Sequence, residues 1–216
     1  MLRRTLLTLS LLMLGPMACA QTSNEPYQEG VHYTAFAQPV RVQNPNKINV
    51  TEVFWYGCSH CFTFEPMVQA WSAKLPNDVV FHHSPAMWNG VMRLHAQTYY
   101  TAKALKALDQ VHQPIFNALN LERKRLASQG EIEQLFVKQG IDAEKFEKAW
   151  GSFGVRSQVQ QADARARAYK ISGTPEVIVN GRYRITTAMA KGQANMLKVA
   201  EFLIEKERQR LSGSKN

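Results

Sequence analysis

The sequence predicts an α/β fold interrupted by a long helical insertion, and three observations lead to this expectation. A β-branched and aromatic run at residues 47–56 is typical of a buried strand, and a helical pattern follows it directly. Helix formers then dominate from about Met92 to Trp150. Near the C-terminus, Asn180-Gly181 separates two short strand patterns, which indicates a hairpin with a type I′ turn.

The individual elements follow from local patterns. The first helix is expected from Ser59 to Leu75, with a kink at Pro66, because proline removes a backbone donor. Turn signals at Gln113-Pro114 and Gln139-Gly140 divide the helical stretch. The expected order along the chain is strand 47–56, helix 59–75, strand 78–83, helices within 92–126 and 129–150, helix 156–170, strands 175–179 and 182–185, and helix 192–210.

Composition and the N-terminus place the chain among exported globular proteins. With 216 residues, 45% apolar and 20% charged, it can bury one core and is neither disordered nor collagenous. Residues 1–20 place Arg3-Arg4 before an apolar run that breaks at Gly15-Pro16 and ends in Ala18-Cys19-Ala20, which predicts a signal peptide cleaved after Ala20. A retained anchor is disfavoured because the run is short. Lipid attachment at Cys19 is disfavoured by Pro16.

The positive net charge does not indicate a particular function. Without Arg3 and Arg4, the expected mature chain has 24 basic and 17 acidic residues. Its basic clusters at 122–125 and 165–167 have helical spacing, which is typical of a solvated helix face. Because a secretory signal precedes the fold, we expect no nucleic-acid partner.

Only Cys58 and Cys61 remain after the predicted cleavage, two residues apart in a compartment where disulfides persist. A structural disulfide normally closes a longer loop, since such a short loop removes little entropy from the unfolded chain. A metal site using Cys58, His60 and Cys61 stays open as an alternative, but it lacks a fourth ligand in the sequence. Redox chemistry is the favoured interpretation.

The position of the pair supports this interpretation. Cys58 is expected at the N-terminal edge of a helix, where unpaired N–H groups and the macrodipole stabilise a thiolate. His60 adds a donor near the sulfur. Cys61 lies one turn further in, and burial is expected to keep it a neutral thiol.

The order of elements is that of a thioredoxin fold with an inserted all-helical domain, and several motifs make the likeness specific. The matching features are Glu52 six residues before the first cysteine, Cys58-Ser59-His60-Cys61, Phe64-Glu65, Ala149-Trp150-Gly151-Ser152-Phe153, Gly173-Thr174-Pro175 and Val179-Asn180-Gly181. Over essentially its whole mature length, the chain resembles periplasmic thiol:disulfide oxidoreductases of the DsbA type. The expected domains are residues 21–84 and 156–216 for the thioredoxin fold and 85–155 for the helical insertion.

The resemblance implies a set of site residues. It implies a cis Pro175 facing the dithiol, with the Thr174 backbone open to an extended substrate segment. It also implies that Glu52 relays the proton of the buried cysteine, paired with a lysine that this chain replaces by His83. Ser59 departs from the family's usual proline, which predicts a less extreme oxidant. An ordinary turn at Thr174-Pro175 and a surface role for His83 remain the alternatives.

The implied function is a periplasmic dithiol oxidase without a cofactor beyond the Cys58–Cys61 disulfide. Its expected partners are unfolded secreted polypeptides and a quinone-linked membrane reoxidase of the DsbB type, with the protein itself a monomer. Trp55, Met87 and Trp88 are expected to rim a substrate groove, since exposed methionine and tryptophan would suit a promiscuous peptide site; the alternative is that they belong to the core. The alternatives are a disulfide isomerase or reductase, which would need a dimerisation region that we do not expect before the fold, and a copper or zinc carrier.

Overall fold

The computed structural model describes residues 25–213, and the predicted signal peptide and Cys19 lie outside them. A five-stranded sheet has the order β1-β5-β4-β2-β3. The strands are β1 (Thr34–Ala35), β2 (Ile48–Phe54), β3 (Val79–Pro85), β4 (Glu176–Val179) and β5 (Tyr183–Thr186). Strand β2 is buried along its whole length, because β3 pairs with it in parallel and β4 pairs with it antiparallel. Its C-terminal end leads directly into the cysteine motif.

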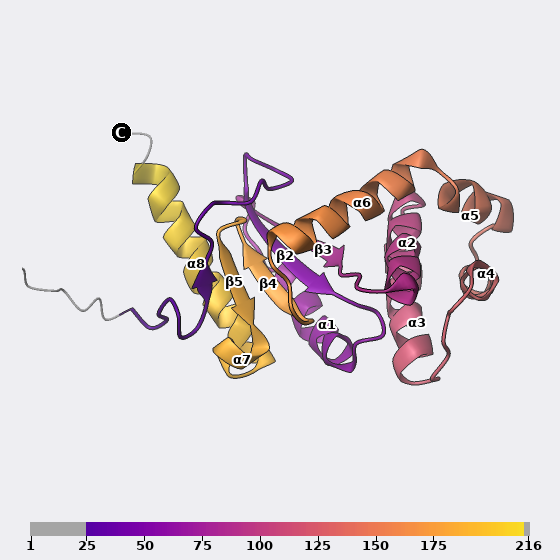
Figure 1. The fold of residues 1–216 in the computed structure, drawn as a ribbon, viewed down its shortest axis with the longest axis horizontal. Helices are drawn as coiled ribbons and strands as arrows, with labels where there is room; N and C mark the ends of the chain where they lie inside the picture. Colours follow the sequence, from indigo (N-terminus) through magenta and orange to yellow (C-terminus); the bar gives the residue numbers. More distant parts are fainter. Residues whose placement is uncertain (1–24, 214–216) are drawn as a thin grey trace, which may run out of the picture.

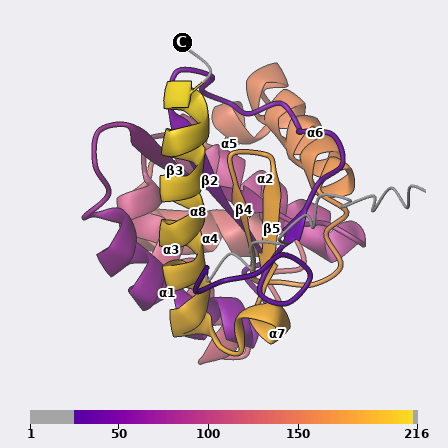
Figure 2. The same cartoon turned by 90° about the vertical axis from the view of Figure 1, so that its left-hand side faces the viewer.

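Eight helices surround this sheet within the described residues. They are α1 (Ser59–Ser72), α2 (Gly90–Ala104), α3 (Leu108–Asn120), α4 (Gln129–Lys138), α5 (Ala143–Trp150), α6 (Phe153–Ala168), α7 (Thr187–Ala190) and α8 (Gln193–Gly213). Helices α2–α5 gather beyond β3, whereas α8 lies at the opposite side of the molecule (Figure 1). Seen from that side, α8 runs across the front of the sheet (Figure 2).

Two apolar clusters hold these layers together. One joins the sheet to α1 and α8 through residues such as Val50, Phe64 and Leu203. The other joins β2 to the helical part and α6, and it includes Cys61 and Phe116. Helix α1 therefore contributes to both clusters, and its first turn is fixed between the sheet and the helices.

The structure confirms the predicted order of elements and corrects details. The stretch 92–126 holds two helices, but they divide at residues 105–107. The turn predicted at Gln113-Pro114 is wrong, because Pro114 lies inside α3, whereas the turn predicted at Gln139-Gly140 follows α4. Helix α1 runs through Pro66 without interruption. The short β1, which sequence patterns did not predict, pairs with β5. Asn180 and Gly181 both have positive φ, as the predicted hairpin turn requires. The domain limits at residues 84 and 155 stay a prediction.

Within residues 25–213, no helix is both long and apolar enough to span a bilayer.

Candidate active site

The cysteine motif sits where β2 gives way to α1. Cys58 is the N-cap of α1, with extended backbone angles, and its Sγ accepts a hydrogen bond from the Cys61 backbone N–H at 3.3 Å. The two cysteines are unbonded, so the structure represents the reduced dithiol. Cys58 is partly exposed and Cys61 is buried. A nucleophile can therefore reach only the first sulfur.

The loop before β4 faces this sulfur. The Thr174–Pro175 peptide bond is cis, as the resemblance implied. The Cys58 sulfur lies 3.3 Å from the Thr174 carbonyl oxygen, to which it donates when it is protonated. Residues 116 positions apart in the chain thus place a reactive sulfur beside an open stretch of backbone.

The surroundings separate the two thiols electrostatically. A hydrogen bond from the Cys61 thiol is the largest cause that lowers the pKa of Cys58 to about 5; partial burial opposes it, while Thr174 and backbone N–H groups of α1 add to it. Burial, together with the hydrogen bond to Cys58, raises the pKa of Cys61. Cys58 is therefore a thiolate at neutral pH, whereas Cys61 holds its proton.

Behind the dithiol lies a group of ionisable side chains that we call the buried polar cluster: Glu52, Glu65, His83 and His112. The His83 Nε2 atom lies 3.3 Å from Glu52 Oε2 and 3.1 Å from Glu65 Oε2. The His112 Nε2 atom lies 3.3 Å from Glu65 Oε1. Among the described residues, the ligand atoms of Glu65, His83 and His112 lie within 4.8 Å of one another and could hold a metal ion.

The members of the cluster shift one another's pKa values. Burial raises the pKa of Glu52, although His83 partly offsets this. Burial also opposes ionisation of Glu65, but the close contacts with His112 and His83 outweigh it and lower its pKa. Burial would lower the pKa of His83, but the close contacts with the Glu52 and Glu65 carboxyl groups raise it to about 9. The predicted contact between Glu52 and His83 is thus present, with Glu65 as a second carboxylate.

The predicted rim of the site is only partly exposed. Trp88 is 55% exposed, and Trp55 is partly exposed. The expectation that Met87 lies exposed is wrong: it is 7% exposed, because it follows β3 into the apolar cluster of the helical part. The Trp55 indole N–H donates to His95 Nδ1 at 3.0 Å, which holds the ring against Gly57.

The two residues between the cysteines point to solvent. Ser59 and His60 are both exposed. The His60 carbonyl oxygen accepts a hydrogen bond from the Gln193 side chain, which ties the first turn of α1 to the start of α8. His60 does not belong to the group of described residues whose ligand atoms converge. The structure therefore gives no support to a metal site built from Cys58, His60 and Cys61.

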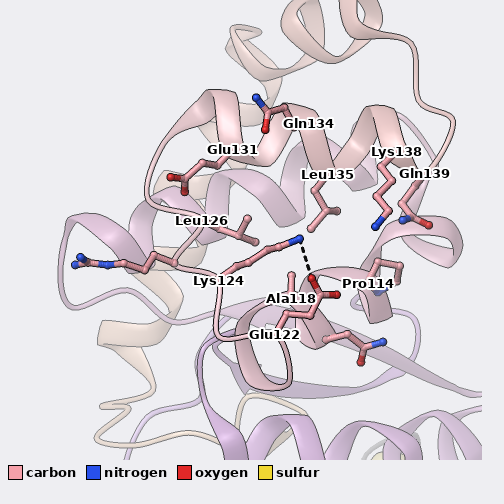
Figure 3. Close-up of a pocket in the computed structure, with 12 residues that line it drawn as sticks. Pro114, Ala118, Glu122, Lys124, Leu126, Glu131, Gln134, Leu135, Lys138 and Gln139 are labelled. Atoms are coloured by element: carbon pink, nitrogen blue, oxygen red, sulfur yellow. Dashed lines mark ion pairs between the residues drawn. The ribbon is translucent and has the colours of Figure 1, made fainter.

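A separate pocket of about 650 Å³ opens in the helical part, lined by residues of α3, α4 and the loop between them. Figure 3 shows Leu126 and Leu135 beside its charged rim, where Lys124 pairs with Glu122 at 2.7 Å. None of the predicted site residues lines this pocket. The dithiol lies outside it, so the pocket is not the reaction site.

Sequence reasoning missed two members of the buried polar cluster as functional candidates. Glu65 lies seven residues after Cys58, two turns along α1, and it entered the sequence analysis only as part of a matching motif. His112 comes from α3 in the helical insertion. No local sequence pattern predicts that His112 lies in this cluster, because its position depends on how α3 packs against α1 and β3.

A partly exposed cysteine at a helix start, a buried second cysteine one turn on and a cis proline facing them define a thiol:disulfide oxidoreductase of the thioredoxin class. Comparison with known proteins narrows this class. Residues 49–203 match the sequence profile of the DSBA-like thioredoxin domain, and the chain belongs to this family.

Named relatives are similar over nearly their whole length. The chain is 43% identical to the thiol:disulfide interchange protein DsbA of Azotobacter vinelandii over 199 residues, which are 92% of each chain. It is 39% identical to the protein of the same name from Pseudomonas aeruginosa over 207 residues, covering 96% of this chain and 98% of the relative. The crystal structure of Pseudomonas aeruginosa DsbA superposes with a TM-score of 0.83 at 40% identity, covering 86% of this chain and 97% of that one.

Proposed function

We propose that the Cys58–Cys61 pair is the redox centre through which this oxidoreductase donates a disulfide to secreted proteins. In the oxidised protein, a substrate thiolate attacks the Cys58 sulfur, a mixed disulfide forms, and Cys61 leaves and takes up a proton. A second substrate thiolate then attacks the substrate sulfur of the mixed disulfide and releases Cys58 as a thiolate. The substrate loses two electrons and gains a disulfide, and the protein gains both electrons as a dithiol.

The observation that carries this direction of transfer is the environment of Cys58. Its Sγ accepts the Cys61 backbone N–H at the start of α1 and has a pKa of about 5. Stabilising the thiolate stabilises the reduced protein, and a protein whose reduced form is stabilised is a stronger oxidant. A low pKa also makes Cys58 a good leaving group in the second step.

The substrate is an extended, unfolded polypeptide with free cysteines. The Thr174 backbone beside Cys58 supports this, because backbone hydrogen bonds accept a strand of any sequence. The exposed Trp88 provides apolar surface near the beginning of the helical part. Ser59, His60 and Pro175 complete the proposed site around the dithiol.

The protein acts in the periplasm, where its disulfide is regenerated by a quinone-linked membrane partner of the DsbB type. The predicted signal peptide and the family membership support this location. The chemistry needs no cofactor beyond the disulfide itself. The role of Glu52 as a proton relay and the monomeric state stay predictions.

The test is oxidation of a reduced, unfolded protein such as ribonuclease by the oxidised chain, compared with Cys58→Ala. We expect stoichiometric oxidation by the wild type and none above background by the variant, because the attacked sulfur is gone. Cys61→Ala cannot form the donor disulfide and should also oxidise nothing; given an oxidised substrate such as scrambled ribonuclease, its Cys58 thiolate should attack a substrate disulfide, expel one substrate thiolate and remain in a mixed disulfide. Oxidation that survives in Cys58→Ala contradicts the mechanism, and efficient refolding of scrambled ribonuclease without net oxidation would indicate an isomerase.

A further inference from the structure

The buried polar cluster draws its four side chains from four different elements. Glu52 comes from β2, Glu65 from α1, His83 from β3 and His112 from α3. Glu52 is 0% exposed, and Glu65 and His112 are also buried. Two carboxyl groups and two imidazoles thus gather inside the protein behind the dithiol. The ligand atoms of Glu65, His83 and His112 converge within 4.8 Å, and Glu52 adjoins them through His83.

The hydrogen bonds within residues 25–213 leave this cluster incompletely satisfied. Neither carboxylate oxygen of Glu52 has a hydrogen-bond partner there, and neither does His112 Nε2. The His83 Nε2 atom faces one oxygen of Glu52 and one of Glu65, at 3.3 and 3.1 Å. A single N–H group can donate well to only one of them. Buried polar atoms without partners are costly, so the arrangement calls for a further cation.

The contacts are long for charge-assisted hydrogen bonds, and their length also matches the spacing of metal ligands. Charge-assisted N–H···O bonds are about 2.7–2.9 Å long. The three imidazole–carboxylate contacts in the cluster are 3.1–3.3 Å. With metal–ligand bonds of about 2.0–2.1 Å, neighbouring ligand atoms of a tetrahedral zinc site lie about 3.3 Å apart.

The Tyr56 hydroxyl is compatible with the His112 tautomer that a metal site needs. The His112 Nδ1 atom lies 2.7 Å from the Tyr56 hydroxyl oxygen. With a proton on Nδ1 donated to that oxygen, Nε2 presents its lone pair to Glu65, 3.3 Å away. Metal-binding histidines are usually held in this way by a hydrogen bond from the other ring nitrogen.

We propose that Glu65, His83 and His112 form a binding site for one divalent transition-metal ion, with Zn²⁺ as the best match, a water as the fourth ligand, and the buried Glu52 beside His83 as the balancing charge. Two carboxylates and two neutral imidazoles balance the two positive charges, so the complex is neutral in its buried surroundings. Imidazole and carboxylate are both common zinc ligands. On binding, the ion takes the place of the proton on His83, which is released to solvent.

The fold gives the ion a way in and a structural effect. His83 lies on the edge strand β3, and its side chain is 17% exposed, so this face of the cluster reaches solvent. Once bound, the ion connects β3 and α1 to α3 through His83, Glu65 and His112. Binding therefore stabilises the packing of these elements against one another.

The test is titration of the untagged, oxidised full-length protein with ZnCl₂ by calorimetry, and with CoCl₂ by visible absorption. The disulfide keeps both active-site thiols from binding metal. We expect one ion per chain, intense Co²⁺ bands of tetrahedral type that Zn²⁺ removes, and a higher melting temperature with Zn²⁺. A Cys58→Ser/Cys61→Ser double variant should bind equally well.

Variants locate the site. His83→Lys and His112→Gln should each weaken Zn²⁺ binding by on the order of 100-fold, and Tyr56→Phe by roughly 10-fold. His82→Ala, next to His83 on β3, is the matched control and should bind as the wild type does. Far-UV circular dichroism and thermal unfolding without metal show whether each variant is folded.

Two results would overturn the proposal: no saturable binding to the oxidised wild type, or unchanged affinity in a folded His83→Lys or His112→Gln variant. If both variants fail to fold, Glu65→Gln replaces them, and unchanged affinity there counts equally against the site. The proposed function is tested by activity without added metal, so either claim can fail alone.

Discussion

Two buried carboxylate sites lie toward opposite ends of β2, and they differ in how well their charges are paired. At the end that starts β2, Glu207 of α8 accepts hydrogen bonds from Asn180 at 2.6 Å and from Arg210 at 2.8 and 3.0 Å. Toward the dithiol end, neither oxygen of Glu52 has a hydrogen-bond partner within residues 25–213. Both side chains are 0% exposed.

The difference separates a structural site from a chemical one. The Glu207 site joins the β4–β5 turn to α8, and every charge has a fixed partner there. The buried polar cluster behind Cys61 contains polar atoms without hydrogen-bond partners. Such atoms lower the stability of the fold, and proteins usually retain them only where a function or a ligand requires them. Changes at the first site should therefore reduce the stability of the fold, whereas changes at the second should affect its chemistry more.

The largest effect on stability is expected at Glu207. Glu207→Ala should lower the free energy of unfolding by about 3 kcal/mol, because it leaves Asn180 and Arg210 without their charged partner. Urea unfolding followed by circular dichroism measures this. The control is Glu205→Ala, whose exposed pair with Arg208 should contribute less than about 1 kcal/mol. Equal effects of the two variants would remove the contrast between a buried and an exposed pair.

A smaller effect is expected just before the dithiol. An added Cβ at Gly57 would lie 2.4 Å from the Trp55 indole. Gly57→Ala should therefore destabilise the protein by about 1–3 kcal/mol through overpacking. Gly154→Ala is the matched control, since a Cβ there meets nothing within 4 Å. If the clash is the cause, the penalty disappears in a Trp55→Ala background, and a penalty that persists would refute it.

The smallest effect is expected at Glu52. Glu52→Gln should raise the free energy of unfolding by about 1 kcal/mol in the presence of EDTA, since a neutral amide replaces a buried carboxyl group without partners. The measurement is urea unfolding of the reduced protein. A loss of stability as large as that of Glu207→Ala would show that Glu52 is paired as firmly as Glu207.

Features that depend on neighbouring residues in the chain could be predicted from the sequence. The dithiol at a helix start was predictable, because strand, cysteines and helix follow one another within residues 47–75. The type I′ turn at Asn180-Gly181 was predictable for the same local reason. The cis bond before Pro175 was implied by family resemblance alone, since proline by itself favours trans.

Features that depend on packing between distant parts of the chain could not be predicted from the sequence. His112 is 47 positions from Glu65, and only the docking of α3 against α1 brings them together at 3.3 Å. Met87 follows the strand pattern of β3, but its burial depends on how the helical insertion closes over that end. The long helical stretch hid the break between α2 and α3, because helix formers continue through it.

The central claim is that the start of α1 makes Cys58 a stable anion while Cys61 stays protonated. Absorbance of the thiolate at 240 nm, followed against pH in the reduced protein, tests it most directly. We predict one transition with a midpoint near pH 5 that is absent in Cys58→Ala. The lowered pKa also means that the thiolate's contribution to the stability of the reduced fold is complete above about pH 9 and disappears as the pH falls through 5. Two thiols that both titrate near the ordinary value of about 8.5 would contradict the account.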